Sequence, residues 1–406
     1  MRRAAALVVV ALAPLAGCGG GNAASTRITS DTLTIYTGLP LRGHRADEGR
    51  AVLRGEKLAL QDAGGHVDNL TIGLIALDDT NTNTGDWDPG RVAENARQAA
   101  ENPTTIAYIG DLNSGATAVS VPLTNEIGVL QVSPLSSYTG LTQPADKGEP
   151  DKYYPSGKRT FARLVPTGAE EAGALATLIR QRGFGRVSLA YDGLQEGLGQ
   201  GGELERALHD HGIQVIDVVR LDPHDGPADV ASDARDLVAD PAPAVIYAGA
   251  STTAAVALLR AVADRDPGEA LFATSGVADR ELAIGLEAVT SDISVTSPLL
   301  PLSQRPPVAR RVAAHYRQEF GSSTPAAALY GYEAMRSVLD AIRRAGHNRN
   351  DRQAVIDSYF RTAVADSVLG PYAIEARGDT TATTIGGFRV QAGRLRFDRL
   401  LPAPAG

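Results

Sequence analysis

In TIAYIGDLNSGATAVSVPLTNEIGVLQVSP, residues 105–134, two β-branched runs enclose a helical pattern. Thr105–Ile109 and Val129–Ser133 have the short apolar character of buried strands, and Gly115–Ile127 lies between them. This order is typical of parallel strands that are joined by a crossover helix. The stretch therefore predicts an α/β fold built on a doubly wound parallel sheet.

The same alternation continues on both sides of this stretch. Upstream, strands over Leu33–Thr37 and Leu70–Leu77 alternate with helices over Asp47–Ala63 and Pro89–Glu101. After a loop rich in polar and turn residues, 142–159, a second alternating series runs from Ala169 to Ala273 and includes a helix over Glu203–His211. We therefore predict two Rossmann-like lobes in series, each with a parallel sheet.

The last hundred residues contain helices that have no strands of their own. They are predicted over Pro307–Phe320, Ala326–Ala345 and Asp351–Phe360. Such helices must bury their apolar faces on a sheet that other parts of the chain form. We expect them to return to lobe one and a final hairpin to return to lobe two, with several hinge crossings and a cleft between the lobes. The predicted boundaries are 31–158 plus 299–363 for lobe one and 159–298 plus 364–400 for lobe two.

The N-terminus has the features of an export signal. Arg2 and Arg3 precede an apolar run that is too short to span a bilayer, and Leu15-Ala16-Gly17-Cys18 contains the only cysteine of the chain. We predict a lipoprotein signal peptide over residues 1–18, lipidation of Cys18 and a flexible tether over residues 19–30. The protein would then be anchored to the extracytoplasmic face of the cell membrane. The alternative is an ordinary secretory signal in which the cysteine is incidental.

Composition and motifs exclude several classes of function. A net charge of −8 argues against a nucleic-acid partner, and 43% apolar with 21% charged residues is ordinary for a soluble globular protein. Gly-x-Ser-x-Gly, His-Glu-x-x-His and P-loop motifs are all absent from the sequence. We therefore predict a protein that is not an enzyme and that uses no cofactor.

A glycine-rich segment imitates a nucleotide-binding motif. Gly197-Leu198-Gly199-Gln200-Gly201-Gly202 has the glycine spacing of a dinucleotide site, and Asp222 follows the next predicted strand. The first glycine, however, comes several residues after the preceding strand ends, so the tight turn that cradles phosphate is missing. We do not expect a nucleotide site here.

Two patterns imitate metal sites. Asp79, Asn81 and Asn83 alternate like the first ligands of a calcium loop, but the glycine comes one residue late and the closing glutamate is missing. His209 and His211 are two positions apart on a predicted helix, so their side chains diverge. Solvated turns and a helix terminus are the favoured interpretations, and we predict no metal site.

The best candidate for a binding site lies in two loops that follow neighbouring strands of lobe one. The first contains Asn113 and Ser114 at the start of a helix, and the second is the hydroxyl-rich segment Ser133–Thr139. Either loop alone could be helix capping. Together they favour a ligand, because the carboxyl ends of parallel strands lie side by side and the free amides of a helix start attract anions.

Motifs throughout the chain resemble those of one family, the solute-binding proteins of branched-chain amino-acid ABC transporters, of the leucine/isoleucine/valine type. The resemblance rests on the order of many short segments, namely Leu39–Gly43, Gly55–Leu60, Tyr108–Ser114, Gln131–Pro134, Gly140–Thr142, Arg159–Thr167 and Ala328–Ala334. It implies the type I periplasmic binding protein fold. It also implies a receptor that closes on a small polar solute, an amino acid or a related compound, and presents it to the permease subunits of an ABC importer.

The resemblance also assigns roles to residues of the two loops. Ser114 would hold the carboxylate of the ligand, while the carbonyl of Leu135 and the hydroxyl and amide of Ser137 would hold its amino group and second carboxylate oxygen. Ser136 and Tyr138 lie in the same loop and complete the lobe-one set of candidates.

The resemblance weakens in lobe two. Ser275 stands where the family has an acidic residue that binds the ammonium group of the ligand. The family's tyrosine in the first loop of lobe two is absent, and that loop offers Glu196 instead. We hypothesise that Glu196 supplies the missing charge. Arg45 is a further candidate, which could bind an anionic group of the ligand.

Two other functions remain open at this stage. A lipoprotein of the same fold could sense a ligand and signal to a membrane receptor, and an exported hydrolase could assemble its catalytic groups only on folding. A monomer suits a receptor with a hinge.

Overall fold

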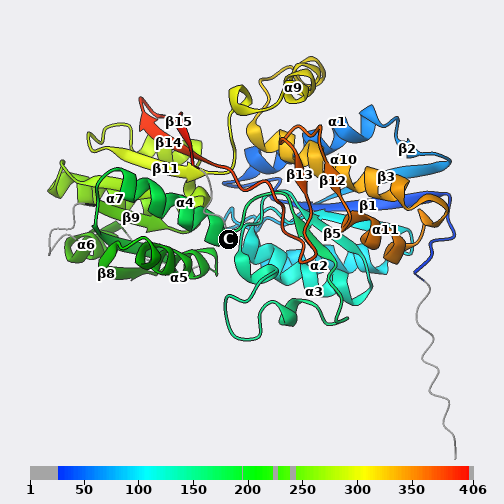
Figure 1. The fold of residues 1–406 in the computed structure, drawn as a ribbon, viewed down its shortest axis with the longest axis horizontal. Helices are drawn as coiled ribbons and strands as arrows, with labels where there is room; N and C mark the ends of the chain where they lie inside the picture. The colour runs from blue at the N-terminus through cyan, green and yellow to red at the C-terminus, as the bar shows by residue number, and fades with distance from the viewer. Residues whose placement is uncertain (1–25, 194, 223–226, 238–243, 402–406) are drawn as a thin grey trace, which may run out of the picture.

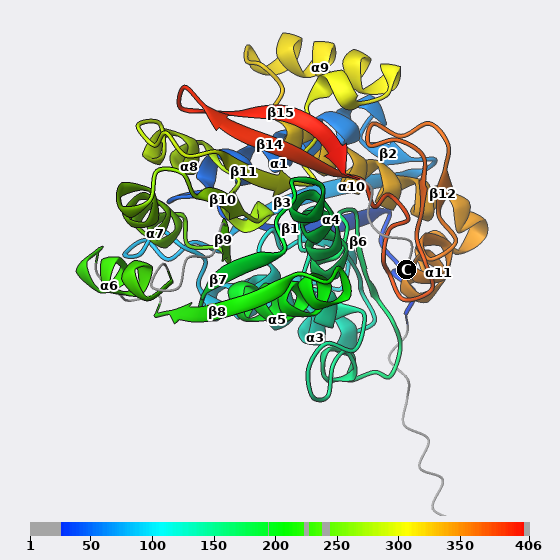
Figure 2. The same cartoon turned by 60° about the vertical axis from the view of Figure 1, so that its left-hand side comes forward.

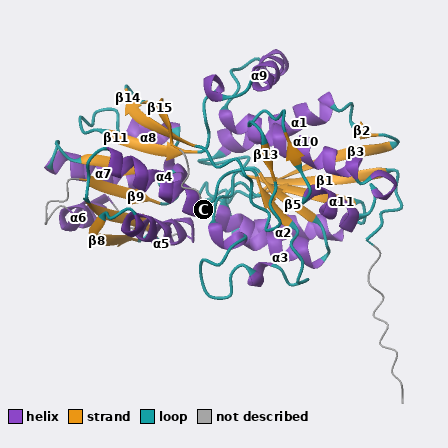
Figure 3. Ribbon diagram, viewed as in Figure 1, coloured by secondary structure: helices purple, strands orange, loops and turns teal. Residues whose placement is uncertain are grey.

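The computed structural model describes residues 26–193, 195–222, 227–237 and 244–401. Two α/β lobes lie side by side in it (Figures 1 and 3). Cys18, the signal peptide and most of the predicted tether lie outside the described residues, so lipidation stays a prediction. Among the helices that are described, none has both the length and the apolar character that a membrane crossing requires.

The first lobe is built on a six-stranded sheet with the order β2-β3-β1-β4-β5-β6, in which only β2 runs antiparallel to its neighbour. Its strands are β1 (Thr32–Leu39), β2 (His66–Val67), β3 (Leu70–Asp78), β4 (Thr105–Gly110), β5 (Leu130–Ser133) and β6 (Phe161–Arg163). Its helices are α1 (Ala46–Asp62), α2 (Pro89–Glu101), α3 (Ser114–Glu126), α9 (Pro307–Phe320), α10 (Ala326–Arg344) and α11 (Arg352–Tyr359).

The second lobe is built on a seven-stranded sheet with the order β15-β14-β11-β10-β9-β7-β8. Its strands are β7 (Arg186–Asp192), β8 (Gln214–Leu221), β9 (Ala244–Ala248), β10 (Ala270–Ala273), β11 (Ile293–Ser297), β14 (Ile385–Gln391) and β15 (Arg394–Leu401). Its helices are α4 (Gly168–Gln181), α5 (Gln195–Asp210), α6 (Pro227–Leu237), α7 (Thr252–Arg265) and α8 (Arg280–Gly285). The β14–β15 hairpin adds an antiparallel edge to the five parallel strands, as Figure 2 shows.

Each sheet is buried between two layers of helices. In the first lobe, α1 and α10 share one apolar core with the strands, and α2 and α3 lie on the opposite side of the sheet (Figure 1). In the second lobe, α6, α7 and α8 pack on one face of the sheet, while α4 and α5 pack on the other. Both faces of the parallel strands are therefore covered, which explains why their sequences are continuous apolar runs.

The contact between α1 and α10 depends on glycine. A Cβ atom on Gly55 would lie 2.0 Å from the carbonyl oxygen of Ala328, and one on Gly331 would lie 2.1 Å from that of Val52. Any side chain at these positions would push the two backbones apart. The last third of the chain is thus held directly against the first helix.

The α/β fold class with two lobes is confirmed, and the chain crosses between the lobes three times, at 164–167, 298–301 and 374–384. Two segments lie with the first lobe although the predicted boundaries place all of one and most of the other in lobe two. β6 pairs with β5, and the short hairpin β12 (Ala363–Val364) with β13 (Tyr372–Ala373) leads into the core of the first lobe. The boundaries themselves stay a prediction.

Two elements differ from the sequence expectation. Helix α5 begins at Gln195, eight residues before the predicted start, so the glycine-rich segment is helical. The loop over 142–159 is not simply polar, because Tyr153 and Tyr154 are buried in a small aromatic cluster with Tyr138 and Phe161. Both features border the space between the lobes.

Candidate functional site

The two hydroxyl-bearing loops meet at the carboxyl ends of β4 and β5. Ser114, the first residue of α3, accepts hydrogen bonds at its Oγ from the backbone amides of Ser137 and Tyr138, each at 3.2 Å. Asn113 caps the same helix by accepting the amide of Gly115 at 2.8 Å. Ser114 and Ser137 are 2% and 7% exposed at this junction, so the predicted pair does come together.

Not every hydroxyl in these loops is available to a ligand. Ser136 is fully buried, and its Oγ donates to the carbonyl of Asp111 at 3.1 Å and lies 2.5 Å from the hydroxyl of Thr117. Its neighbour Leu135 is half-buried and packs against the first-lobe core. Ser136 therefore fixes the loop to α3, and the hydroxyls of Ser114 and Ser137 stay the better candidates for contact with a solute.

Arg163, which the sequence analysis did not single out, positions the second loop. Its Nη1 donates to the carbonyls of Ser136 (3.1 Å) and Tyr138 (2.8 Å), and its Nη2 donates to the hydroxyl of Thr142 (2.8 Å). Its Nε lies 2.9 Å from Oδ1 of Asp379, and the two side chains are 0% and 4% exposed. A buried, paired guanidinium of this kind holds several carbonyls in fixed positions.

On the lobe-two side, Ser275 is joined to an acid that the sequence did not reveal. Glu171, in the first turn of α4, accepts the amide of Ser275 at 2.7 Å and its hydroxyl at 2.5 Å. It also accepts the hydroxyl of Thr296 at 2.6 Å. Burial raises the pKa of Glu171, although these hydrogen bonds favour its charged form. Ser275 is thus a partner of a buried glutamate within lobe two.

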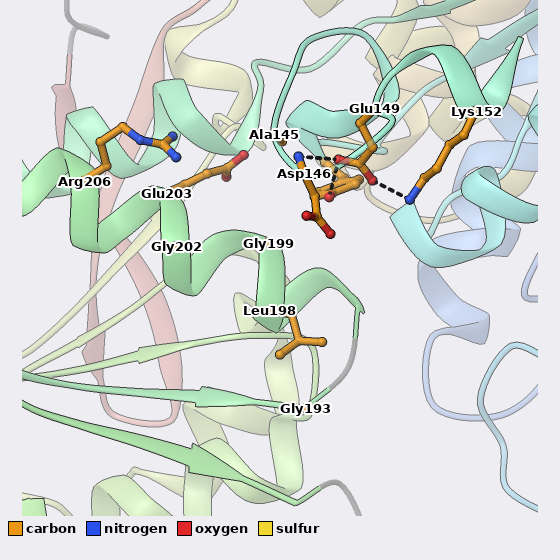
Figure 4. Close-up of a pocket in the computed structure, with 11 residues that line it drawn as sticks. Ala145, Asp146, Glu149, Lys152, Gly193, Leu198, Gly199, Gly202, Glu203 and Arg206 are labelled. Carbon is orange, nitrogen blue, oxygen red and sulfur yellow. Dashed lines mark hydrogen bonds and ion pairs between the residues drawn. The ribbon is translucent and has the colours of Figure 1, made fainter.

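A pocket of ≈ 490 Å³ opens between the lobes beside Tyr138 (Figure 4). Its volume lies within the range of about 300–1,000 Å³ that is usual for small-molecule sites. The first lobe contributes Tyr138, Ala145, Asp146, Glu149 and Lys152, and the second contributes Gly193, Leu198, Gly199, Gly202, Glu203 and Arg206. One wall is therefore the 138–152 segment and the other is α5.

On the first wall, Glu149 is fully engaged. It accepts the hydroxyls of Tyr138 (2.7 Å) and Tyr153 (2.8 Å), and Lys152 Nζ lies 2.8 Å from its Oε1. Burial alone would raise the pKa of Glu149, but the hydrogen bonds from Lys152 and the two tyrosines outweigh it and hold the pKa below its usual value. This carboxylate therefore stays ionised and supports the wall.

On the second wall, Glu203 is in the opposite situation. It is 6% exposed, and neither of its carboxylate oxygens has a hydrogen-bond partner among the described residues. Burial raises its pKa to about 7, and the nearby Thr139 hydroxyl, Arg163 and Arg206 offset only part of that effect. The Thr139 hydroxyl favours the ionised form of Glu203, although no contact between the two groups meets the normal geometry of a hydrogen bond.

Of the predicted site residues, Tyr138 is the only one among the described residues that line this pocket. Arg45 pairs with Glu48, with Nε 2.9 Å from Oε2. Glu196 is the second residue of α5, and its side chain lies outside the described part of the structure. In the loop after β3, the side chain of Asn81 donates to Asp88 at 3.0 Å. Within the described residues, no group of three or more His, Cys, Asp or Glu side chains could hold a metal ion.

The comparison with protein families decides the identity of the chain. Residues 37–394 match the profile of the Periplasmic binding protein family. The chain belongs to the periplasmic binding proteins. The members of this family to which the protein is structurally similar are solute-binding proteins rather than enzymes. The comparison with curated proteins gives no match.

Several solved structures share the fold of this periplasmic binding protein. The leucine-binding protein LivK of Thermotoga maritima is 20% identical with a TM-score of 0.78, covering 91% of this chain and 99% of the other. LivJ of Streptococcus pneumoniae, in complex with isoleucine, is 16% identical with a TM-score of 0.73 and the same coverage. A solute-binding protein of Rhodopseudomonas palustris, in complex with benzoate, is 15% identical with a TM-score of 0.75, covering 92% and 98%.

Sequence reasoning predicted the lobe-one part of the candidate site of this periplasmic binding protein. The serine loops were predictable, because each follows a recognisable strand and strand ends of one sheet are neighbours. Glu171, Arg163 and Glu203 were missed, because their positions depend on contacts between elements that are distant in sequence. The only local signal was the pattern Thr167-x-x-Glu170, a capping box that fixes the start of α4 and so the place of Glu171.

Proposed function

We propose that this periplasmic binding protein is the extracytoplasmic receptor of an ABC importer and binds a small polar solute, an amino acid or a related compound, between its lobes. The observation that carries the proposal is the pocket between the 138–152 segment and α5, which is lined by Tyr138, the residue whose amide donates to Ser114. Such a position lets one solute contact both lobes and favour their closed arrangement. The permease would then recognise the closed form.

The serine junction is suited to a carboxylate. Ser114 Oγ accepts two amides and still has its own proton to donate. A carboxylate that enters here would accept a hydrogen bond from that hydroxyl close to the start of α3, where the helix dipole favours negative charge. The relatives that bind leucine, isoleucine and benzoate all have ligands with a carboxylate.

Attachment to the membrane through Cys18 is part of the proposal and is supported by the sequence around that residue. Acylation of Cys18 would be read from the mass of the mature chain. A mature protein that keeps Cys18 unmodified, or that begins elsewhere, would exclude the anchor and leave the receptor function unaffected.

The receptor function is tested with a solute panel. L-Leucine, L-isoleucine, benzoate and p-hydroxybenzoate are offered to the purified protein in thermal-shift and titration calorimetry experiments. At 100 times its dissociation constant, a ligand should stabilise the protein by about 2.7 kcal/mol. We expect at least one class to bind with 1:1 stoichiometry, and Ser114→Ala to weaken that binding by about 10-fold or more.

The matched control is Ser322→Ala, at an exposed position after α9. It should bind as the unchanged protein does. Turnover of a panel member, or equal losses in both serine variants, would contradict the proposed role.

A further inference from the structure

Glu203 occupies a position that internal packing does not explain. Figure 4 shows its side chain pointing from α5 toward the loop that carries Ala145 and Asp146, and its carboxylate lines the pocket. A Cβ atom on Gly168 would lie 2.3 Å from its Oε2, so the carboxylate sits directly against the first residue of α4. Glycine at 168 leaves just enough room for this acid.

The charged groups around Glu203 are already committed or exposed. Arg163, on β6, binds two carbonyls, Thr142 and Asp379. Glu171, on α4, binds Ser275 and Thr296. Arg206 lies one turn away on α5 and is exposed to solvent. None of the described residues donates a hydrogen bond to Glu203.

A buried carboxylate without a partner is costly, and a native protein retains one where something else satisfies it. The missing group must donate hydrogen bonds and should carry positive charge. The pocket lining is acidic on balance, because Asp146, Glu149 and Glu203 outnumber the cations Lys152 and Arg206, and Lys152 is itself paired with Glu149. An ammonium group has three donors and matches this requirement.

We propose that Glu203 binds the ammonium group of the solute, and that this receptor therefore selects amine-bearing compounds over acids that lack an amino group. The inference rests on the proposed function and specifies its substrate class. It replaces both Ser275, which is held by Glu171, and Glu196 as the source of the lobe-two charge.

The test uses matched pairs of probes at pH 8, where Glu203 is ionised. One pair is L-leucine with 4-methylpentanoate, and the other is L-phenylalanine with 3-phenylpropanoate. Calorimetry should give dissociation constants about 10- to 100-fold lower for the amine-bearing member of a pair that fits the pocket. Glu203→Gln should remove that preference. Glu205→Gln, an exposed glutamate on the same helix, should keep it.

A second measurement needs no variant. As the pH falls below about 7, the affinity of the unchanged protein for the amine-bearing probe should fall by about tenfold per pH unit, because Glu203 takes up a proton. Affinity for the amine that stays constant between pH 8 and pH 5.5 would overturn the inference even if Glu203→Gln failed to fold.

The remaining outcomes separate the inference from the proposed function. Tight binding of benzoate or of the acids without an amino group would overturn the inference and leave the receptor function standing. Loss of the amine preference in Glu196→Gln but not in Glu203→Gln would also overturn it. Absence of binding for every probe of both classes would overturn the inference and the proposed function together.

Discussion

The carboxylate of Glu203 makes the stability of the protein depend on pH. Its pKa is 4.5 in a reference chain and about 7 in the folded protein, because burial disfavours the charged form. Below pH 4.5 the group is protonated in both states and its contribution to stability is fully present. Between these two values the unfolded chain loses the proton first, so stability is lost as the pH rises.

We predict that Glu203→Gln removes this loss. The pKa shift corresponds to about 3 kcal/mol at most. Without ligand, the stability difference between the variant and the unchanged protein should therefore move in favour of the variant by about 3 kcal/mol between pH 4.5 and pH 8. Urea unfolding at both pH values measures the difference. Asp79, whose pKa burial raises to about 8, titrates in both proteins and cancels. An equal stability difference at the two pH values would contradict the prediction.

Single residues also show where sequence reasoning stops. Ser114 and Ser137 were predictable because each follows a recognisable strand, and their contact is a consequence of parallel strand order. Glu171 and Glu203 are ordinary helix glutamates in the sequence. Their burial depends on α4 and α5 packing against each other, with Gly168 of α4 against the carboxylate of Glu203, which no local pattern encodes.

Helix α5 has a high glycine content because three of its glycines face close neighbours. Cβ atoms on Gly197, Gly199 and Gly201 would lie 2.2 Å from Asp192 Oδ1, 2.5 Å from Tyr138 Cε2 and 2.7 Å from Tyr191 Cδ1. Each glycine costs a helix about 1 kcal/mol relative to alanine. This is why the sequence predicted a later start, and why tertiary contact rather than propensity decides where the helix begins.

These contacts lead us to different predictions for Gly199 and Gly201. In Gly199→Ala, the added methyl group would clash with Tyr138, which belongs to the first lobe. The variant should therefore keep the lobes apart and weaken solute binding by about tenfold or more. In Gly201→Ala, the added methyl group would clash with Tyr191 within the second lobe, so the variant should have lower thermal stability and an unchanged affinity for the solute. Calorimetry and thermal unfolding of both variants check this. Equal affinity losses would refute the assignment of Gly199 to the lobe contact.

On the scale of the whole molecule, Arg163 and Asp379 link two of the three crossings. Arg163 ends β6 just before the first crossing, and Asp379 lies in the last one. Thr142 and Gln143 donate to the same aspartate, each at 2.8 Å. The hinge region and the loop that carries Ser137 therefore share one buried ion pair.

We predict that Arg163→Ala destabilises the protein by about 3–5 kcal/mol, because it removes a fully buried guanidinium and leaves the buried Asp379 with only the half-exposed Arg377 as a charged partner. Arg343→Ala removes an exposed pair with Asp340 on α10 and should cost at most about 1 kcal/mol. Urea unfolding compares the two. Adding Asp379→Asn to Arg163→Ala should recover part of the loss. A cost for Arg163→Ala as small as that for Arg343→Ala would show that the pair does not link the crossings.

The two-lobed architecture was predictable because strands and helices alternate regularly from Leu33 to Ala273. The position of β6 was not, because Phe161–Arg163 is too short to give a strand pattern and pairs only once β5 is in place. Residues 368–374 join the first core for a similar reason. Short connecting segments take their structure from the lobe against which they happen to lie.

The backbone contact of Gly55 with α10 sets an order for biosynthesis. The core of the first lobe draws on residues from Ile28 to Ile374, so it cannot close while the ribosome is still adding the C-terminal helices. The parallel strands of the second lobe, β7 to β11, are all present by residue 297. The second lobe also buries residues of β14 and β15, which end at Leu401, so neither lobe can complete its core until synthesis is almost finished.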